Sequence, residues 1–434
     1  MKLREYQRDG YNKGLELHDR GRQSLCMVMP PGAGKTVLGS HLGISIAQKR
    51  QGCVLWVAHR RELIKQAKNT LEKLGFQAGV IAPWGRPNLD LPIQVGSIQT
   101  LRNMNLDDLP HFASVVWDEA HHAMSDDWVM LAKECRRRRS FLLGLTATPE
   151  RKDGRGMAPL FGSMIVVATQ SQLIAKGHLV PTDVLVPPRV IKDGVADAPV
   201  KLWEKHTPGT KTIVFCESVE HAQRVAEQFD DRGHRADYVE GEMTSRERER
   251  AIKRFVSGRT MILTNCQLLT EGFDLPPIQT VVLARRVGSH ALYLQMVGRG
   301  SRPFKGKSRA TLLDLAGSAK LYGLPDEDRK FSLKGKPITL KDTKRTGKSK
   351  LCLACNMVFY ERTSRCPRCG SPVGKTKKSK VYSDKLHKMG ADEARAYEKA
   401  ALDRFMDYAK IHSKPMEWVK DRFFRKFGRL PEGM

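Results

Sequence analysis

The stretch MPPGAGKT, Met29–Thr36, follows the apolar run SLCMVM and leads into the helix-like segment TVLGSHLGISIAQKR. It agrees with the phosphate-binding pattern G-x-x-x-x-G-K-[ST] at every fixed position except the first, where Met29 replaces glycine. A strand, a glycine-rich loop and a helix N-terminus in this order aim backbone N–H groups at phosphates. Because the first position falls at the end of the strand, a side chain there can point away from a ligand. The stretch therefore predicts a nucleotide site on a strand–loop–helix unit.

The residues of this loop have distinct expected roles. Glycines supply the unusual backbone angles of the turn, Lys35 reaches the β- and γ-phosphates, and the Thr36 hydroxyl binds Mg²⁺. The predicted cradle consists of Gly32, Ala33, Gly34, Lys35 and Thr36. Taken alone, the stretch remains open to a second interpretation as a chance Gly/Pro turn.

A pair of carboxylates supports the nucleotide interpretation. In SVVWDEAHH, Asp118 and Glu119 end an apolar run, which places them at the end of a buried strand. There Asp118 can hold Mg²⁺, and Glu119 can orient and deprotonate an attacking water. Two surface carboxylates in a loop are the alternative, but the apolar lead-in argues against it.

Strand-like and helix-like segments alternate along most of the chain, which predicts an α/β fold with parallel sheets covered on both faces. This alternation continues to about Phe161 and then becomes less regular. It starts again at KTIVFCES and ends near residue 320. We expect an N-terminal α/β domain over 1–165, a linker over 166–208 and a second α/β domain over 209–330. A basic linker over 331–349, a cysteine module over 350–373 and a basic, helical tail over 374–434 follow.

The charge of the chain is unusual. A net charge of +28 and a pI near 9.9 favour polyanionic partners, nucleic acid first. An adaptation for solubility is the alternative. The N-terminus has no apolar segment of a secretory signal, and no apolar run approaches the roughly 20 residues of a membrane helix. We therefore expect an intracellular, cytoplasmic protein.

At DEAH the chain resembles superfamily 2 helicases and translocases, and the resemblance extends over most of residues 1–320. It implies two tandem RecA-like domains that bind ATP with Mg²⁺. In LREYQ, Gln7 would read adenine. AHRREL and GSIQTL would contact the nucleic-acid backbone, and TATP would couple hydrolysis to movement. The residues implied for these roles are Arg60, Gln99 and Thr100 for nucleic acid, and His121, Thr146 and Thr148 for coupling.

The second α/β unit carries the remaining elements of the resemblance. IVFCES, which ends at Ser218, opens this domain and implies a nucleic-acid contact. ILTNCQLLTEGFDLP would place Thr264 on a backbone phosphate and Gly272 and Asp274 near the ribose and the domain interface. QMVGRGSRP would supply Gln295 and two arginine fingers, Arg299 and Arg302. Such arginines on the second domain would complete the catalytic site only when the two domains close on ATP.

The segment CLACNMVFYERTSRCPRCG contains two C-x₂-C pairs separated by ten residues. This spacing is typical of a tetrahedral Zn²⁺ site with ligands Cys352, Cys355, Cys366 and Cys369. Four thiolates leave no open coordination position, so a structural role is expected; a redox pair is the alternative. Because Arg362, Arg365 and Arg368 surround the ligands, the module could contact DNA or dock on a domain.

The tail over 374–434 shows helical spacing. Tyr397, Phe405 and Tyr408 fall on one face, and Phe423 and Phe427 alternate with basic residues. Such aromatic and basic residues can stack bases and hold phosphates, but we favour an amphipathic helix that packs on its neighbour. Similar tails occur in phage-encoded helicases.

These observations favour an ATP-dependent helicase or translocase that acts on DNA, with RNA as a further possible partner. DNA is preferred because TATP and the cysteine module resemble those of DNA-directed members. The alternatives are an RNA helicase, the motor subunit of a restriction or remodelling complex, and a nucleic-acid clamp that ATP switches without unwinding. A small-molecule P-loop kinase would leave the second α/β unit unexplained.

Overall fold

The computed structural model describes residues 2–85, 87–122, 126–149, 156–187, 198–266, 268–270, 278–334, 350–359 and 363–373, and in the tail 402, 403, 406, 409 and 415–420. The chain divides into two compact units, 1–373 and 374–434. The aromatic residues on which the prediction for the tail rests lie outside the described residues. Within the described part of the chain, no helix is long and apolar enough to cross a membrane.

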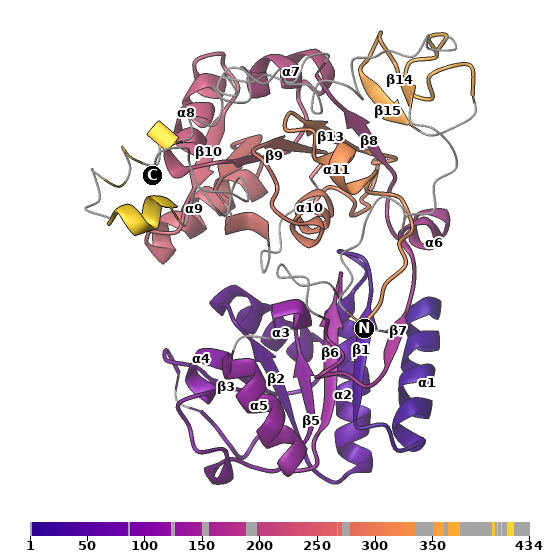
Figure 1. The fold of residues 1–434 in the computed structure, drawn as a ribbon, viewed down its shortest axis with the longest axis vertical. Helices are drawn as coiled ribbons and strands as arrows, with labels where there is room; N and C mark the ends of the chain where they lie inside the picture. Colours follow the sequence, from indigo (N-terminus) through magenta and orange to yellow (C-terminus); the bar gives the residue numbers. More distant parts are fainter. Residues whose placement is uncertain are drawn as a thin grey trace. The chain divides into compact units, whose positions relative to one another are not determined.

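The first unit contains two lobes, each built on its own sheet (Figure 1). The N-terminal lobe has a parallel sheet in the order β3-β4-β2-β5-β6-β1-β7. Nearly every residue of β2, β4, β5 and β6 is buried, as expected for strands covered on both faces. The strands are β1 (Ser24–Val28), β2 (Cys53–Ala58), β3 (Gly79–Ile81), β4 (Ile93–Ser97), β5 (Phe112–Trp117), β6 (Phe141–Thr146) and β7 (Met164–Val166).

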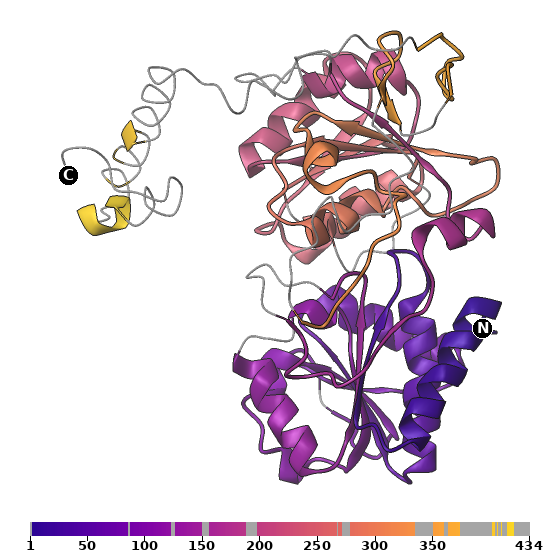
Figure 2. The same cartoon turned by 45° about the vertical axis from the view of Figure 1, so that its right-hand side comes forward.

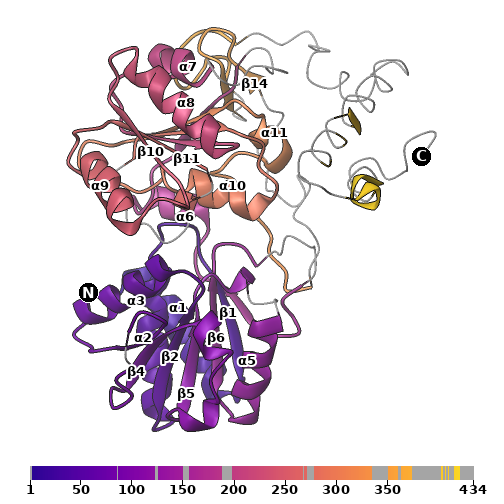
Figure 3. The ribbon, with the colours of Figure 1, turned by 90° about the vertical axis from the view of Figure 1, so that its left-hand side faces the viewer.

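Helices cover both faces of this sheet. The helices are α1 (Glu5–Asp19), α2 (Lys35–Lys49), α3 (Arg61–Lys73), α4 (Ile98–Leu101) and α5 (Asp126–Arg137), with 3₁₀ turns η1 (Leu106–Asp108) and η2 (Ala120–His122). Residues of α1, α2 and α3 share one apolar cluster, and residues of α4 and α5 share the other. Figure 3 shows α5 across the sheet from α1 and α2.

Glycines bring α2 close to the sheet. A Cβ on Gly39 would lie 2.4 Å from Leu145, and one on Gly43 would lie 2.6 Å from Val116. A glycine inside a helix costs about 1 kcal/mol relative to alanine, and here the close approach compensates for that cost. The N-terminus of α2 is thereby held next to the end of β1.

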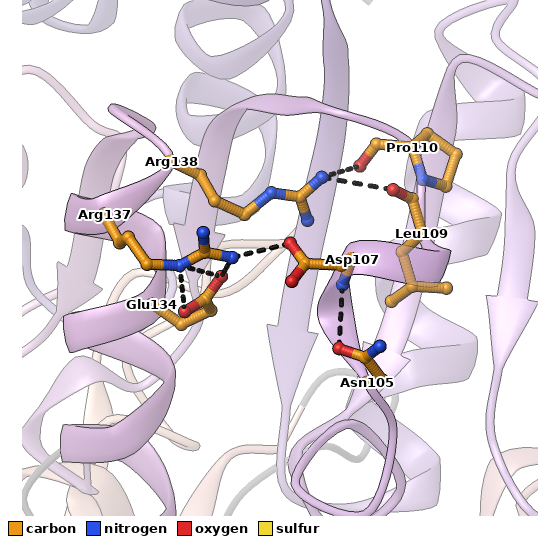
Figure 4. A network of polar contacts seen from close by, with 7 residues as sticks. All are labelled: Asn105, Asp107, Leu109, Pro110, Glu134, Arg137 and Arg138. Atoms are coloured by element: carbon orange, nitrogen blue, oxygen red, sulfur yellow. Dashed lines mark hydrogen bonds and ion pairs between the residues drawn. The ribbon is translucent and has the colours of Figure 1, made fainter.

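Arginines at the end of α5 fasten this helix to η1 (Figure 4). The Arg137 guanidinium contacts Glu134 on its own helix and donates to Asp107 of η1 at 2.6 Å. Arg138 donates to the carbonyl oxygens of Leu109 and Pro110. These contacts hold α5 against the segment that follows α4.

The C-terminal lobe has a sheet in the order β10-β11-β9-β12-β13-β8-β15-β14. The six strands from β10 to β8 pair in parallel, whereas β15 is antiparallel to β8 and to β14. The strands are β8 (Thr182–Leu185), β9 (Thr212–Cys216), β10 (Ala236–Val239), β11 (Ile262–Asn265), β12 (Thr280–Ala284), β13 (Ala310–Asp314), β14 (Lys350–Leu351) and β15 (Met357–Phe359). The predicted α/β fold with two RecA-like lobes is thus confirmed.

The helices of this lobe also lie on both faces. They are α7 (Ala198–His206), α8 (Val219–Asp230), α9 (Ser245–Val256), α10 (His290–Val297) and α11 (Ser318–Tyr322), with the turn η3 (Leu268–Thr270). Residues of α9, α10 and α11 share one apolar cluster, and residues of α7 and α8 share the other with the cysteine module.

The segment predicted as a linker, 166–208, contains regular structure. It includes α6 (Gln170–Ala175), strand β8 and helix α7. Strand β8 pairs with β13 and receives β15 of the cysteine module on its other side. Prolines directly before β8 and soon after it are loop signals, which explains why the sequence did not predict this strand.

After α11 the chain returns to the N-terminal lobe (Figure 2). Asp328 accepts hydrogen bonds from the backbone N–H and the hydroxyl of Ser171 in α6. Phe331 and Leu333 pack against the N-terminal core, and the Leu333 carbonyl accepts from Ala158 N. The first residues of the predicted basic linker, 331–334, are therefore packed on this lobe.

Candidate active site

The stretch Met29–Thr36 forms a tight loop between β1 and α2. Gly32 and Gly34 have φ values of 82° and 78°, in the left-handed region that favours glycine. Gly34 is the N-cap of α2 and carries no side chain that could satisfy the N–H groups of the first turn. Met29 is completely buried in the core of the lobe. The replacement of the first glycine therefore leaves the phosphate-facing side of the loop unchanged.

Two residues of α1 hold this loop from behind. The Tyr6 hydroxyl donates to the Ala33 carbonyl at 2.8 Å, and Gln7 Nε2 lies within hydrogen-bond distance of the Ala33 and Gly34 carbonyls. Gln7 Oε1 accepts from Arg4 N. Both ends of the Gln7 amide are thus engaged by the protein backbone, and adenine recognition by Gln7 stays a prediction.

A cavity of about 320 Å³ brings the predicted catalytic residues of both lobes together. Its size falls at the lower end of the range for ligand pockets, about 300–1,000 Å³. The C-terminal lobe contributes α10 and the loop after it. The lining residues are Pro31, Gly32, Gly34, Lys35, Thr36, Leu63, Gln66, Asp118, Glu119, Gln295, Gly298, Arg299 and Arg302.

The loop that carries the arginines lies directly against the phosphate-binding loop. A Cβ on Gly32 would lie 3.2 Å from Arg302 Cγ, and one on Gly298 would lie 2.5 Å from Pro31 Cβ. Both positions are glycine, so the two loops can approach each other. The arginine pair of one lobe therefore shares a cavity with the lysine of the other.

The acidic pair follows β5, as predicted from the apolar run. Asp118 is 5% exposed, and its carboxylate accepts from Glu119 N at 3.0 Å. Glu119 has a φ of 48°, which is uncommon for a residue other than glycine and is found often at functional sites. Glu119 Oε1 lies 3.8 Å from Lys35 Nζ. The strained backbone turns the Glu119 carboxylate toward the phosphate-binding lysine.

His121 in η2 connects Glu119 to the other lobe. His121 Nε2 lies 3.3 Å from Gln295 Nε2, whereas His121 Nδ1 lies 3.2 Å from Thr146 Oγ1 and 3.4 Å from Glu119 Oε2. The Thr146 hydroxyl donates to the Thr148 carbonyl. Because Gln295 Nε2 can only donate, we assign the proton of a neutral His121 to Nδ1, where it faces Thr146 and Glu119.

Residues predicted to contact nucleic acid gather at one edge of the N-terminal sheet. Arg60 is the N-cap of α3, directly after β2, and Gln99 and Thr100 lie in α4, directly after β4. Since β2 and β4 are neighbours in a parallel sheet, their carboxyl ends meet. Gln99 Nε2 donates to the His59 carbonyl at 3.1 Å. The predicted contact of this edge with nucleic acid remains a proposal.

The corresponding residues of the C-terminal lobe are placed differently. Ser218 caps α8 by accepting from His221 N at 3.1 Å. Thr264 is completely buried, and its hydroxyl donates to the Ala222 carbonyl at 2.7 Å. A phosphate would have to displace this bond, so the structure does not support the predicted contact of Thr264. Gly272 and Asp274 lie outside the described residues.

Some residues near the cavity were not predicted from the sequence. Leu63 and Gln66 of α3 line it, and their spacing of three places both on one helical face. The His122 ring lies 4.2 Å from the His121 ring and 4.4 Å from the His59 ring. These histidines extend from the acidic pair to the edge that carries Arg60 and Gln99.

The four predicted cysteine ligands form one cluster, with all four Sγ atoms within 4.8 Å of one another. The Cys352–Cys369 and Cys355–Cys366 Sγ atoms are each 3.6 Å apart. A tetrahedron with Zn–S bonds of about 2.3 Å requires S–S distances of about 3.8 Å. The donor set and its dimensions therefore fit Zn²⁺.

The cysteine module packs on the C-terminal lobe. Arg368 donates to the His206 carbonyl of α7 at 3.0 Å, and its guanidinium lies 3.9 Å from Asp183 of β8. Lys350 and Arg365 donate to carbonyl oxygens within the module. These cationic groups contact the protein itself, which favours docking over the DNA contact that the sequence left open. Arg362 lies outside the described residues.

The sequence matches two family models. The model described as "Type III restriction enzyme, res subunit" covers residues 1–151, and the model described as "Helicase conserved C-terminal domain" covers residues 195–303. The IRC3 protein of Saccharomyces cerevisiae, named for an ATP-dependent helicase, is 27% identical over 378 residues, covering 76% of this chain and 55% of IRC3. A 51.5 kDa protein of a Lactococcus phage is 29% identical over 366 residues, covering 79% of this chain and 76% of that protein. The chain thus spans little more than half of IRC3.

Solved structures share the fold. A fragment assigned to the HsdR subunit of a type I restriction enzyme from Vibrio vulnificus has a TM-score of 0.58 and 25% identity, covering 76% of this chain and 66% of that chain. The DNA-bound helicase MrfA has a TM-score of 0.56 at 18% identity, covering 72% of this chain and 46% of that chain. With lysine, acidic pair and arginines in one cavity between two RecA-like lobes, these matches show that the chain belongs to the superfamily 2 helicases.

Proposed function

We propose that the chain is a nucleic-acid-dependent ATPase that moves on DNA and unwinds or remodels it. The observation that carries this proposal is the single cavity lined by Lys35 and Glu119 of one lobe and by Arg299 and Arg302 of the other. A site divided in this way is complete only when the lobes are in contact, so ATP binding and lobe closure are coupled.

The phosphate-binding loop and four side chains of the cavity have defined tasks in the proposed reaction. Backbone N–H groups of the loop and the Lys35 ammonium bind the β- and γ-phosphates. Glu119 orients the attacking water and accepts its proton. Arg299 and Arg302 stabilise the charge of the transferring phosphoryl group.

A divalent cation belongs to this chemistry. The Thr36 hydroxyl and the Asp118 carboxylate line the same cavity, and Mg²⁺ prefers oxygen donors of this kind. Thr36 and Asp118 would hold the ion, which would neutralise part of the phosphate charge. Thr36 lies in the first turn of α2, after the loop that follows β1, and Asp118 directly follows β5.

Coupling to nucleic acid follows from the contacts around His121. Because Glu119, Thr146 and Gln295 all approach this ring, movement of one lobe against the other changes the surroundings of the catalytic carboxylate. The edge with Arg60 and Gln99 would bind the nucleic-acid backbone. The charge of +28 would add nonspecific attraction. We place the activity in the cytoplasm. If a phage encodes the chain, the activity would lie in the cytoplasm or nucleoid of the host cell.

The motor of a restriction enzyme is the second candidate, favoured by the likeness to the HsdR fragment. No nuclease motif stands out in the sequence, so cleavage would require a partner. An RNA helicase is a third candidate, and a nucleic-acid clamp that ATP switches without unwinding is a fourth.

ATP turnover measured with single-stranded, duplex, forked and four-way DNA and with RNA tests the proposal. We expect DNA to stimulate turnover, Lys35→Ala to abolish it, and Glu119→Gln to abolish it while ATP binding persists. Turnover that neither substitution affects would refute the motor. Stronger stimulation by RNA would favour an RNA helicase, and nucleotide-dependent DNA binding without turnover would favour the clamp.

A further inference from the structure

Lys307 lies five residues after Arg302, in the loop that connects α10 to β13. Its Nζ donates to three carbonyl oxygens, those of Ile278, Gly300 and Arg302, with distances of 2.5 Å to Ile278 and 3.1 Å to Arg302. An ammonium has three N–H donors. All three are used on backbone oxygens, and none is used on a carboxylate.

The three carbonyls belong to two separate segments. Gly300 and Arg302 are part of the arginine-bearing loop, whereas Ile278 lies just before β12 and is completely buried in the core of the C-terminal lobe. Lys307 therefore ties the loop to a fixed part of the lobe. Burial lowers the pKa of Lys307 to about 8, and the Phe304 ring covers the ammonium at 5.4 Å.

The loop has little regular structure of its own. Between α10 and β13 the backbone forms turns at 298–300 and 305–306 and is otherwise irregular. Its described hydrogen bonds include Val180 N to the Ser301 carbonyl and Lys307 N to the Phe304 carbonyl. Nevertheless, Arg299 and Arg302 must enter the cavity in a defined direction, since electrostatic stabilisation of a transition state requires preorganised donors.

We propose that Lys307 is a positioning residue for the arginine pair: by binding the Gly300 and Arg302 carbonyls, its ammonium sets the direction in which Arg299 and Arg302 enter the cavity. This inference rests on the proposed ATPase function. Lys307 itself does not line the cavity. Lys307 acts through the backbone of the loop. No sequence motif distinguishes it from the other lysines of the chain.

The expected effect is on turnover and not on substrate binding. Arginine fingers accelerate phosphoryl transfer by about 10³–10⁵-fold, so a displaced arginine pair is expected to lower kcat by at least about tenfold. ATP is bound mainly by the opposite lobe, so KM should change little. An arginine at this position keeps the charge and several donors and should restore part of the activity.

The experiment compares Lys307→Met and Lys307→Arg with the matched control Lys305→Met, which removes an exposed lysine from the same loop. kcat and KM for ATP are measured at saturating DNA, together with the midpoint of thermal unfolding. Lys307→Met should lower kcat at similar KM, Lys307→Arg should recover at least part of it, and Lys305→Met should resemble wild type. Equal kcat values for Lys307→Met and Lys305→Met would overturn the inference.

A double-mutant cycle separates positioning from loss of stability. If Lys307 acts through the arginines, Lys307→Met should add little to the loss of kcat in an Arg299→Ala, Arg302→Ala background. Full additivity would overturn the inference, as would a loss of kcat that follows the thermal midpoint alone. Absence of turnover in the wild-type protein, by contrast, would refute the proposed function itself.

Discussion

The side-chain nitrogens His121 Nε2 and Gln295 Nε2 lie 3.3 Å apart, and the two residues come from different lobes. On its other side the His121 ring approaches Glu119 and Thr146. The contact is therefore a direct link between the position of the C-terminal lobe and the carboxylate that would activate water. The His121–Gln295 contact exists only while the two lobes touch at this point. It is therefore suited to transmit lobe contact to the catalytic carboxylate.

Gln295→Ala should lower DNA-stimulated kcat by about 10–100-fold, consistent with loss of a group that supports general base catalysis. ATP affinity should stay within a fewfold of wild type, because Gln295 belongs to the lobe opposite the phosphate-binding loop. The measurement is kcat and KM with and without DNA. His121→Ala should have a similar effect, and the double variant should be little worse than either single one. Independent, additive losses would contradict the link.

Gly34→Ala should lower both the affinity for ATP and the free energy of unfolding. The residue has a φ of 78°, and an added Cβ would lie 2.6 Å from Gln7 Nε2, which holds the loop. Gly21→Ala is a matched control: its φ is 81°, but no atom lies within 4 Å of the added Cβ. The control should lose about 1 kcal/mol of unfolding free energy, the cost of a left-handed backbone. Gly34→Ala should lose more and should bind ATP at least about tenfold more weakly. Equal behaviour of the two variants would show that the Gln7 contact is unimportant.

The sequence predicted those parts of the site that depend on local geometry. The strand–loop–helix around Lys35 and the acidic pair after β5 each occupy one continuous segment, so a pattern of residue types suffices to identify them. Arg299 and Arg302 were placed on the opposite side of the cavity through the family resemblance.

Contacts between distant segments could not be predicted in this way. The burial of Thr264 depends on how α8 packs on β11, and the bonds of Gln7 depend on where α1 lies. The short strand β8 pairs with strands that come more than a hundred residues later, and the prolines around it are typical of a loop. The role of Lys307 depends on three carbonyl oxygens, whose positions the sequence does not reveal.

Association with DNA should depend steeply on salt. If binding uses roughly 6–10 phosphate contacts, affinity should fall by about 10³–10⁵-fold between 50 and 200 mM salt. Titration of a labelled duplex at several salt concentrations gives the slope. A slope near zero would mean that the charge of +28 serves solubility and does not contribute to binding.

The Asp326 carboxyl predicts a pH-dependent stability. Burial raises its pKa from 3.8 to about 6, although Thr182 N donates to it at 2.7 Å. The ionised form is therefore disfavoured in the folded state, and stability from this group is present below about pH 4 and is lost as pH rises through 6. Asp326→Asn cannot ionise. Its stability relative to wild type should increase by about 1–3 kcal/mol between pH 4.5 and 7.5, measured by urea unfolding at both values. A difference that does not change with pH would place the raised pKa in doubt.

If the cysteine cluster binds zinc, as its dimensions allow, removal of the metal should destabilise the sheet of the C-terminal lobe, because the cysteine module supplies the edge of that sheet. Strand β15 pairs with β8, and Cys352 and Cys366 are buried in the same apolar cluster as Trp203 of α7. Binding of structural zinc contributes roughly 10–16 kcal/mol to folding in small peptides. Cys366→Ser removes one of the four thiolate ligands. We therefore expect this variant to lose metal binding and to expose β8. Zinc content measures the loss of metal, and amide hydrogen exchange of residues 182–185 measures the exposure of β8. Cys53→Ser, which changes a cysteine outside the module, is the control.

The same variant decides between docking and DNA contact. If the module is an edge of the sheet, exchange at β8 should increase by at least about tenfold, while DNA affinity measured below the unfolding midpoint changes little. Rapid exchange is expected to be confined to β8 and its neighbours, since β9 and β12 lie in the middle of the sheet. A variant that loses DNA affinity while β8 stays protected would show instead that the module binds nucleic acid directly.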